Sequence, residues 1–230
     1  MMRRYFNGFV PETFEFFRGI RDNNNHEWFE SHRDEYKKYV QTPMKELSAE
    51  LTDGMLSVDE QFITGGRTVS RIRRDTRFSK DKTPYKSVSW LVFKRPNDDW
   101  CDAPAYFIEI GPERYIWGMG FYSAKSATMR RFREIIGADT KRFTDAVSFL
   151  STDVSQPFSL QGEEYKRVPP GIKDDRFADW YRKKNLYLVS EKDNDKSLYG
   201  NGFAGMLLEG FFSLAPLYRI LLEASREPVA

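Results

Sequence analysis

The stretch "AYFIEIGPERYIWGMGFY", residues 105–122, decides the fold class because it predicts two strands joined by a tight turn. Both halves are short and rich in aromatic and β-branched residues, and the intervening "GPER" is typical of a turn. Strands joined by so short a connection pair antiparallel. The runs "TVSRIRR" at 68–74 and "SVSWLVFKR" at 87–95 have the same character. We therefore predict an antiparallel sheet of three to four or more strands over residues 68–122, with 185–190 as a candidate additional strand.

Helical periodicity on both sides of this region completes the predicted fold. Apolar side chains recur at intervals of three and four over residues 9–56, 126–151 and 203–224. Asn24 and Glu27 have the spacing of a capping box, which predicts that a helix starts there. The sequence thus predicts an α+β fold in which the antiparallel sheet is flanked by N-terminal and C-terminal helices.

The composition fits one globular domain. The chain has 230 residues, and its 5 Trp, 12 Tyr and 19 Phe supply the area for a core of ordinary size. No repeat, low-complexity tract or linker marks a boundary, so we expect a single domain over residues 1–230. The most apolar run, residues 204–224, is interrupted by Glu209, Pro216 and Arg219, which favours an amphipathic helix over a membrane span.

The sequence also carries expectations about location. A single cysteine, Cys101, excludes an internal disulfide framework. The N-terminal "MMRRYFNGFVPE" lacks the apolar stretch of a signal peptide. We expect a cytoplasmic protein without a membrane partner, and the sequence does not indicate an oligomeric state.

A basic stretch, "SRIRRDTRFSKDKTPYKS" at 70–87, is the main functional clue. It holds seven Lys or Arg and two Asp, a net charge of +5, on a chain whose formal net charge is +2. On a strand, Arg71 and Arg73 share a face about 6.5–7 Å apart, a spacing that suits a phosphate or carboxylate held between two guanidinium groups. Asp75 and Asp81 are placed to orient the cations. The candidate ligand-binding residues are Arg71, Arg73, Arg77, Lys80, Lys82, Tyr85 and Lys86, with Lys166 and Arg167 from a second basic turn, "KRVPPG".

Four interpretations of this stretch remain open. A solvated loop would pair its charges with acidic helix faces such as Glu46, Glu50 and Asp53 at little energetic gain. A binding site would take a phosphorylated or carboxylated small molecule, and a docking face would take an acidic protein. A nucleic-acid surface would use Phe78, Tyr85 and Trp90 for stacking, but 34 acidic residues dilute the positive field and make nucleic acid the less favoured partner.

The hairpin carries two more features that bear on function. With a four-residue loop, Phe107 lies opposite Gly118 and Ala105 lies opposite Gly120, so an aromatic ring covers a glycine or the glycines leave room for a ligand. Glu109 shares the face of Phe107, where we interpret it as the partner of an arginine rather than as a base.

The sequence assigns neither a catalytic residue nor a reaction. Two histidines, His26 and His32, and one cysteine make a poor metal inventory, and "DDWCD" at 98–102 resembles an ordinary polar turn. His32 lies on an apolar stripe and is interpreted as a core histidine. No phosphate-binding loop or nucleophile motif occurs. We expect no metal and no cofactor.

Several of these segments together carry a family resemblance. "SRIRRDTRFSKDKTPYK", "NNNHEWFESHRDEY", "YFIEIGPERYIWGMGFY" and "KRVPPG" resemble the family catalogued as domain of unknown function 2461, from about Phe9 to the C-terminal helix. The resemblance implies a bacterial or fungal-type conserved protein of one domain. It implies no catalytic residues.

Overall fold

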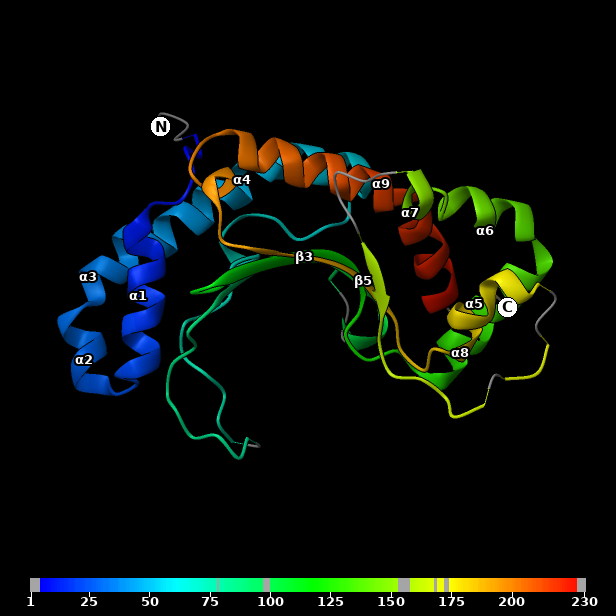
Figure 1. The fold of residues 1–230 in the computed structure, drawn as a ribbon, viewed down its shortest axis with the longest axis horizontal. Helices are drawn as coiled ribbons and strands as arrows, with labels where there is room; N and C mark the ends of the chain where they lie inside the picture. The colour runs from blue at the N-terminus through cyan, green and yellow to red at the C-terminus, as the bar shows by residue number, and fades with distance from the viewer. Residues whose placement is uncertain are drawn as a thin grey trace. The chain divides into compact units, whose positions relative to one another are not determined.

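The computed structural model describes residues 5–77, 79–96, 100–152, 158–167, 169–171 and 174–226. Within these residues it confirms an α+β fold, in which five strands form one antiparallel sheet in the order β1-β2-β3-β5-β4. The strands are β1 (Ser89–Phe93), β2 (Pro104–Ile110), β3 (Arg114–Phe121), β4 (Ser159–Gln161) and β5 (Tyr187–Asp193). The helices, drawn in Figure 1, are α1 (Pro11–Asp22), α2 (His26–Ser31), α3 (Arg33–Glu35), α4 (Thr42–Val58), α5 (Ser126–Ala138), α6 (Thr140–Ala146), α7 (Phe149–Thr152), α8 (Ala178–Arg182) and α9 (Gly202–Ser225).

The predicted hairpin forms β2 and β3. Its turn is closed by a hydrogen bond from the backbone N–H of Gly111 to the carbonyl of Arg114, with an N···O distance of 3.0 Å. The candidate strand at 185–190 is confirmed over residues 187–190, which begin β5. Burial alternates along β1 and β2, so one side chain in two lies in the core and the next is half-exposed.

The predicted strand 68–74 is not a strand of the sheet, which corrects the sequence prediction. The segment makes only isolated bridges, from Val69 to Leu91 and from Arg73 to Tyr85. Between these bridges three residues of one arm face five residues of the other, so no continuous ladder forms. Alternation alone suggested a strand, but regular pairing also needs arms of equal length.

The helix start predicted at Asn24 is also wrong by one residue. Asn25 caps α2, because its side-chain oxygen accepts a hydrogen bond from the backbone N–H of Trp28 at 2.9 Å. The amide of Asn24 instead binds the backbone of Tyr85. Asn24 therefore holds the basic stretch in place rather than starting a helix.

The short edge strand β4 was not predicted from the sequence. It pairs with β5 from Ser159↔Val189 to Gln161↔Tyr187, and a further bridge joins Glu164 to Lys183. Between these pairs two residues face three, which is a β-bulge. Gly162 lies at this bulge with a φ of 122°.

Backbone contacts divide the chain into two compact units. One unit contains Met1–Phe93, Phe107–Trp117 and Glu191–Leu208, and the other contains Lys94–Tyr106, Gly118–Ser190 and Glu209–Ala230. In the first unit, α4 packs on β1 and the ring centroid of Phe62 lies 6.4 Å from that of Phe93. In the second, the ring of Tyr106 contacts those of Phe211 and Tyr218 of α9 at 5.1 and 5.2 Å. The single domain stays a prediction.

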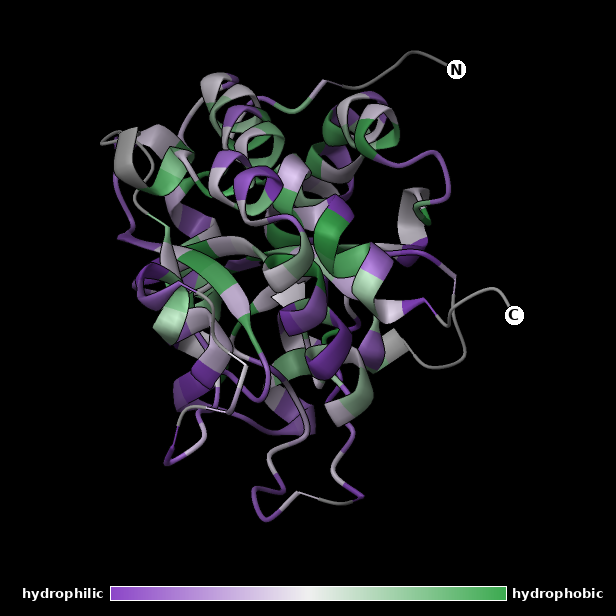
Figure 2. Ribbon diagram, turned by 90° about the vertical axis from the view of Figure 1, so that its right-hand side faces the viewer, coloured by the Kyte–Doolittle hydropathy of each residue, from purple (hydrophilic) through white to green (hydrophobic). Residues whose placement is uncertain are grey.

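Hydropathy along the chain follows these elements. Figure 2 shows hydrophobic stretches along the strands and helices and hydrophilic residues in the long connecting loops. Of the described residues, those of α9 form one helix that is long and apolar enough to cross a membrane, although half of its most apolar window is buried inside the protein. A core helix of a soluble protein has the same properties.

Candidate functional site

The basic stretch forms an irregular hairpin, residues 70–87, which we call the basic hairpin. Figure 1 shows this teal segment leaving the sheet on the side opposite α4. Its base is held by Asn24, which donates to the carbonyl of Tyr85 and accepts from the N–H of Tyr85, both at 3.0 Å. The Tyr85 ring is 1% exposed and stacks on Phe29 at 4.3 Å, while its hydroxyl lies 3.2 Å from Nδ1 of His26. Tyr85 is therefore an anchor of the hairpin and not an exposed ligand contact.

The mismatch between the two arms is concentrated at Arg71. The N–H of Ser70 donates to the carbonyl of Trp90 at 2.8 Å, and the N–H of Lys86 donates to the carbonyl of Ile72 at 2.9 Å. Between these two bonds, one residue of the first arm faces residues 87–89 of the second. Such bulges redirect side chains and occur often beside functional sites.

Three cations gather beside this bulge. Lys86 is half-buried, and burial lowers the pKa of its ammonium group below the usual value. The positive charges of Arg71 and Arg74 lower the pKa of Lys86 further. Arg74 pairs with Asp81 and also donates to the hydroxyl of Thr83 at 2.7 Å. Among the described residues, neither Arg71 nor Lys86 has an ion pair with a carboxylate. We call Arg71, Arg74 and Lys86 the cation cluster.

The sequence prediction missed Arg74, because strict strand alternation places it on the face away from Arg71. Both aspartates bind arginines of the hairpin, while their role in orienting the cations of a site stays a prediction. Asp75 receives hydrogen bonds from Arg77, with an Nη2–Oδ2 distance of 2.7 Å, and these bonds lower the pKa of Asp75 to about 2. Bonds from the backbone N–H of Thr83, from Arg74 and from the Thr83 hydroxyl lower the pKa of Asp81 to about 2.

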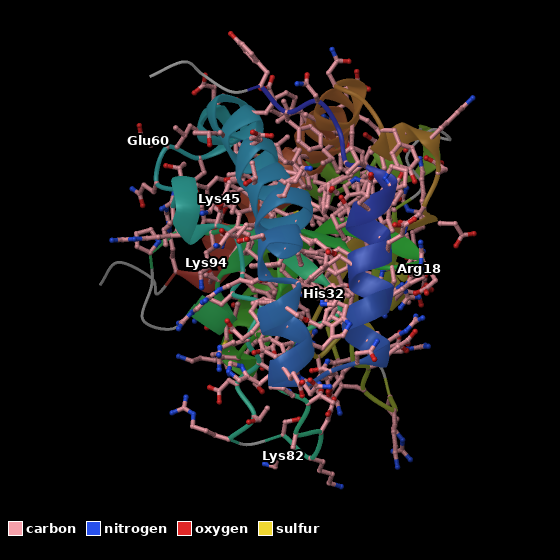
Figure 3. The ribbon with its side chains drawn as sticks, turned by 90° about the vertical axis from the view of Figure 1, so that its left-hand side faces the viewer. Arg18, His32, Lys45, Glu60, Lys82 and Lys94 are labelled. Atoms are coloured by element: carbon pink, nitrogen blue, oxygen red, sulfur yellow. The ribbon has the colours of Figure 1, made fainter. Side chains whose placement is uncertain are left out.

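The remaining predicted residues of the hairpin are not assigned to the cluster. Arg73 is exposed, and its guanidinium carbon lies 5.5 Å from the ring centroid of Tyr85. Lys80 is exposed near the tip. Lys82, labelled at the end of the hairpin in Figure 3, donates to the carbonyl of Thr76 at 2.8 Å. Phe78, a candidate stacking residue, lies outside the described residues.

The sheet surface on the hairpin's side carries aromatic side chains. Ser89, Leu91 and Phe93 of β1 are buried, so Trp90, which lies between Ser89 and Leu91, faces the opposite side and is half-exposed. Its ring centroid lies 6.1 Å from that of Phe107, which is half-exposed on β2. Trp90 is tied to the hairpin, because its N–H donates to the Ser70 hydroxyl at 3.1 Å.

Sequence comparison places this arrangement in a family. A family model described as "Conserved hypothetical protein (DUF2461)" matches residues 12–219. The chain belongs to the DUF2461 family. A comparison with curated proteins finds no match. The matched range includes the whole basic hairpin and the pair of aromatic residues Trp90 and Phe107 on the DUF2461 sheet.

The second basic turn of the DUF2461 chain lies in the other compact unit. Lys166 and Arg167 are exposed there, so the structure assigns them no common site with the basic hairpin. The neighbouring Tyr165 has two cations over its ring, Arg133 and Lys184, each 5.4 Å from the centroid. Gly171 has a φ of 97°, as expected of the glycine that ends this turn.

Two expectations for the hairpin formed by β2 and β3 need correction or refinement. A Cβ at Gly120 would lie 2.4 Å from the Cα of Tyr187, so the close approach of β5 explains this glycine rather than a covering ring or a ligand. Glu109 is half-buried, and this burial is the main reason why the pKa of its carboxyl is raised. The nearby charge of Arg114 lowers this pKa, and that of Glu191 raises it. Arg114 forms its ion pair with Glu191, at 2.6 Å, and not with Glu109.

The polar groups that resembled a metal site have structural roles where they are described. Asp102 is buried and accepts hydrogen bonds from the N–H of Lys125 at 2.7 Å and from the hydroxyl of Thr128 at 2.8 Å, at the start of α5. Residues 98 and 99 lie outside the described part. His32 stacks on Trp28 at 4.0 Å. No group of three metal-binding side chains occurs in the part of the chain that the structure describes.

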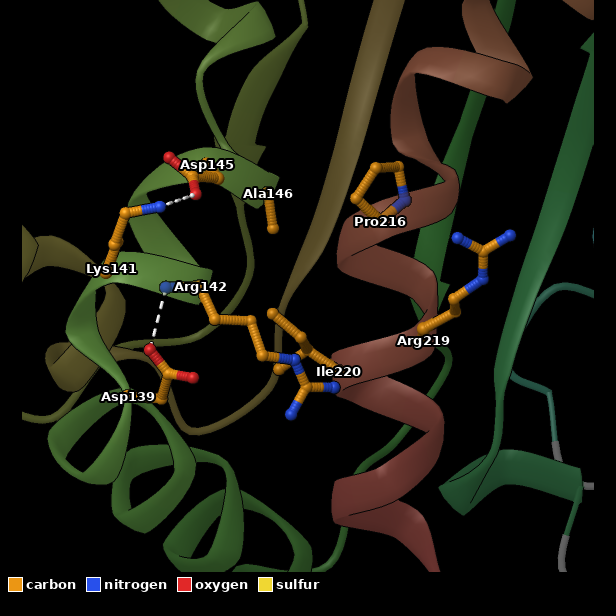
Figure 4. A pocket seen from close by; sticks show the side chains of 8 residues that line it. All are labelled: Asp139, Lys141, Arg142, Asp145, Ala146, Pro216, Arg219 and Ile220. Atoms are coloured by element: carbon orange, nitrogen blue, oxygen red, sulfur yellow. Dashed lines mark hydrogen bonds and ion pairs between the residues drawn. The ribbon is translucent and has the colours of Figure 1, made fainter.

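A separate cavity of 450 Å³ lies between α6 and α9 (Figure 4). Its charged lining is largely paired within the protein. Lys141 binds Asp145 at 3.0 Å, Asp139 accepts from the N–H of Arg142, and the Arg142 guanidinium binds Glu223 at 2.7 Å. Arg219 also lines the cavity, and its charge is balanced by that of Asp139, so the cavity lacks the net positive charge of the cation cluster.

Proposed function

We propose that this DUF2461 protein is a soluble cytoplasmic protein that binds a small phosphorylated or carboxylated molecule at the basic hairpin. The proposal assigns no catalytic residue. Its main support is the half-buried Lys86, whose pKa is lowered by burial and by the charges of Arg71 and Arg74, while Asp81 is the carboxylate paired within the cation cluster.

The physical reason is the cost of placing a half-buried ammonium near two guanidinium groups, that of the exposed Arg71 and that of Arg74. Partial burial disfavours a charged ammonium, and two guanidinium groups nearby disfavour it further. Asp81 compensates one of the three charges, so a net positive charge remains. A bound anion offsets the repulsion, and the guanidinium of Arg71 adds a planar pair of donors that matches phosphate or carboxylate oxygens.

A solvated loop accounts less well for this geometry. Lysines of solvated loops extend their ammonium groups into water, as Lys80 at the exposed tip is free to do. Lys86 instead lies half-buried beside the bulge. The observed ion pairs of the hairpin, Arg74 with Asp81 and Arg77 with Asp75, are formed within it.

Thermal-shift and calorimetric titrations with inorganic phosphate, acetate and sugar phosphates test the proposal. A ligand at 100 times its Kd stabilises the protein by about 2.7 kcal/mol, which raises the melting temperature measurably. Lys86→Met and Arg71→Ala should each weaken binding about ten- to a hundredfold, since hydrogen bonds to charged groups are worth about 1.5–3 kcal/mol.

Lys45→Ala is the matched control, because it removes one positive charge from the exposed surface of α4 in the same compact unit. It should leave binding unchanged. Equal losses in all three variants would indicate nonspecific attraction and contradict the proposal. Binding along a DNA duplex weakens steeply as salt rises. Duplex DNA that still binds tightly at about 0.2 M salt would therefore contradict the small-anion proposal and favour a nucleic-acid function.

A further inference from the structure

The basic hairpin stands beside an aromatic surface that the proposed anion site leaves unused. Trp90 and Phe107 are half-exposed on the sheet face opposite the core, with their ring centroids 6.1 Å apart and their planes inclined by 48°. Aromatic rings at such places provide stacking platforms for flat ligand groups.

Backbone hydrogen bonds fix this pair next to the cation cluster. Ser70 binds Trp90 through both its N–H and its hydroxyl, and Arg71 follows directly in the chain. Lys86 precedes Trp90 by four residues, which spans at most about 13 Å of extended chain. Figure 1 shows the hairpin leaving the sheet on the side away from α4. The long side chains of the cluster can therefore reach a ligand that rests on the rings.

Glu109 lies on the hairpin side of Phe107, because β2 runs antiparallel to β1 and the following Gly111 lies beside Val88. It lies two residues from Phe107 on the same strand face, about 6.5–7 Å away. A carboxylate there repels a phosphate and accepts hydrogen bonds from amino or hydroxyl groups.

We propose that the ligand of this site is a phosphate monoester that carries a planar ring, of the mononucleotide class, with the ring stacked on Trp90 and Phe107. The proposal rests on the proposed anion-binding function. Stacking of one base on an aromatic side chain contributes about five- to 150-fold in affinity.

Isothermal titration calorimetry with inorganic phosphate, ribose 5-phosphate, adenosine and adenosine monophosphate separates the two contributions. Adenosine monophosphate should bind at least about tenfold more tightly than ribose 5-phosphate. Trp90→Ala should remove this difference and leave the binding of ribose 5-phosphate unchanged. Lys86→Met should weaken both compounds. Phe212→Ala, which truncates an exposed aromatic of α9, is the control and should change neither.

Phe107→Ala provides a second test if Trp90→Ala fails to fold, as judged by circular dichroism. Equal affinities for adenosine monophosphate and ribose 5-phosphate in the wild type would overturn the ring-stacking inference and leave the anion site standing. No binding of any phosphate compound would overturn both. A labelled eight-nucleotide single strand that binds more tightly than the mononucleotide, and that depends on Trp90, would overturn the mononucleotide class in favour of nucleic acid.

Discussion

Gly162 shows how one residue decides the course of an edge strand. Its φ of 122° lies in the region that glycine adopts readily and other residues rarely do. A Cβ at this position would lie 1.9 Å from the carbonyl oxygen of Asn185, which belongs to the opposite arm. The bulge between β4 and β5 therefore depends on a glycine at this position.

Gly162→Ala should accordingly lower the free energy of unfolding by about 1–3 kcal/mol, because both backbone strain and the clash with Asn185 oppose it. Urea denaturation measures the change. Gly205→Ala is the matched control, since Gly205 lies inside α9 with no atom within 4 Å of an added Cβ. It should stabilise the protein by up to about 1 kcal/mol. Equal effects of the two substitutions would contradict the role given to the bulge.

At the scale of elements, the basic hairpin depends on a side chain from a distant part of the chain. Asn24 supplies both of the hydrogen bonds that clamp the backbone of Tyr85. The neighbouring Asn25 has a different task, because its side chain caps α2. Adjacent asparagines thus hold two separate elements, and substituting each one distinguishes them.

Asn24→Ala should raise the hydrogen-exchange rate of amides near Tyr85 and weaken anion binding, because the arm that carries Lys86 loses its clamp. Asn25→Ala should cost about 0.5–2 kcal/mol of stability without changing anion affinity. Hydrogen exchange monitored by mass spectrometry, with titration of phosphate, checks both. Unchanged exchange near Tyr85 in Asn24→Ala would show that the stack on Phe29 is sufficient.

The elements themselves could largely be predicted from periodicity, but their pairing could not. The "GPER" turn predicts β2 and β3 because the loop length permits only an antiparallel hairpin. Residues 68–74 alternate as a strand does, yet their partner arm has two residues too many for a continuous ladder. Alternation also places Arg74 away from Arg71, so the sequence prediction omits a member of the cation cluster. The positive charge of the stretch can be seen in the sequence, whereas the bulge beside which Arg71, Arg74 and Lys86 lie cannot.

On the scale of the whole molecule, the two compact units share their elements. The strands β2, β3 and β5 and the helix α9 each contribute residues to both units. Separate unfolding of one unit would therefore break elements that the other also uses. This continuity supports the prediction of a single domain.

Differential scanning calorimetry should show one transition with equal calorimetric and van 't Hoff enthalpies. At about 0.7 kcal/mol per residue, the enthalpy of unfolding near 60 °C should be about 160 kcal/mol. Gly162→Ala should move the whole transition to lower temperature rather than split it. Two resolved transitions would instead show that the compact units unfold as separate domains.

The irregular base of the basic hairpin also bears on edge-to-edge pairing of β-strands between two molecules of this protein. The edge strand of a sheet exposes unpaired N–H and C=O groups to which another chain can add a strand. On the outer side of β1, Thr68 accepts from the N–H of Val92 and Ser70 donates to Trp90. Beyond them the arms are out of register and positively charged. At the β1 edge a second molecule therefore meets an interrupted, positively charged border, which disfavours the pairing of two β1 edges.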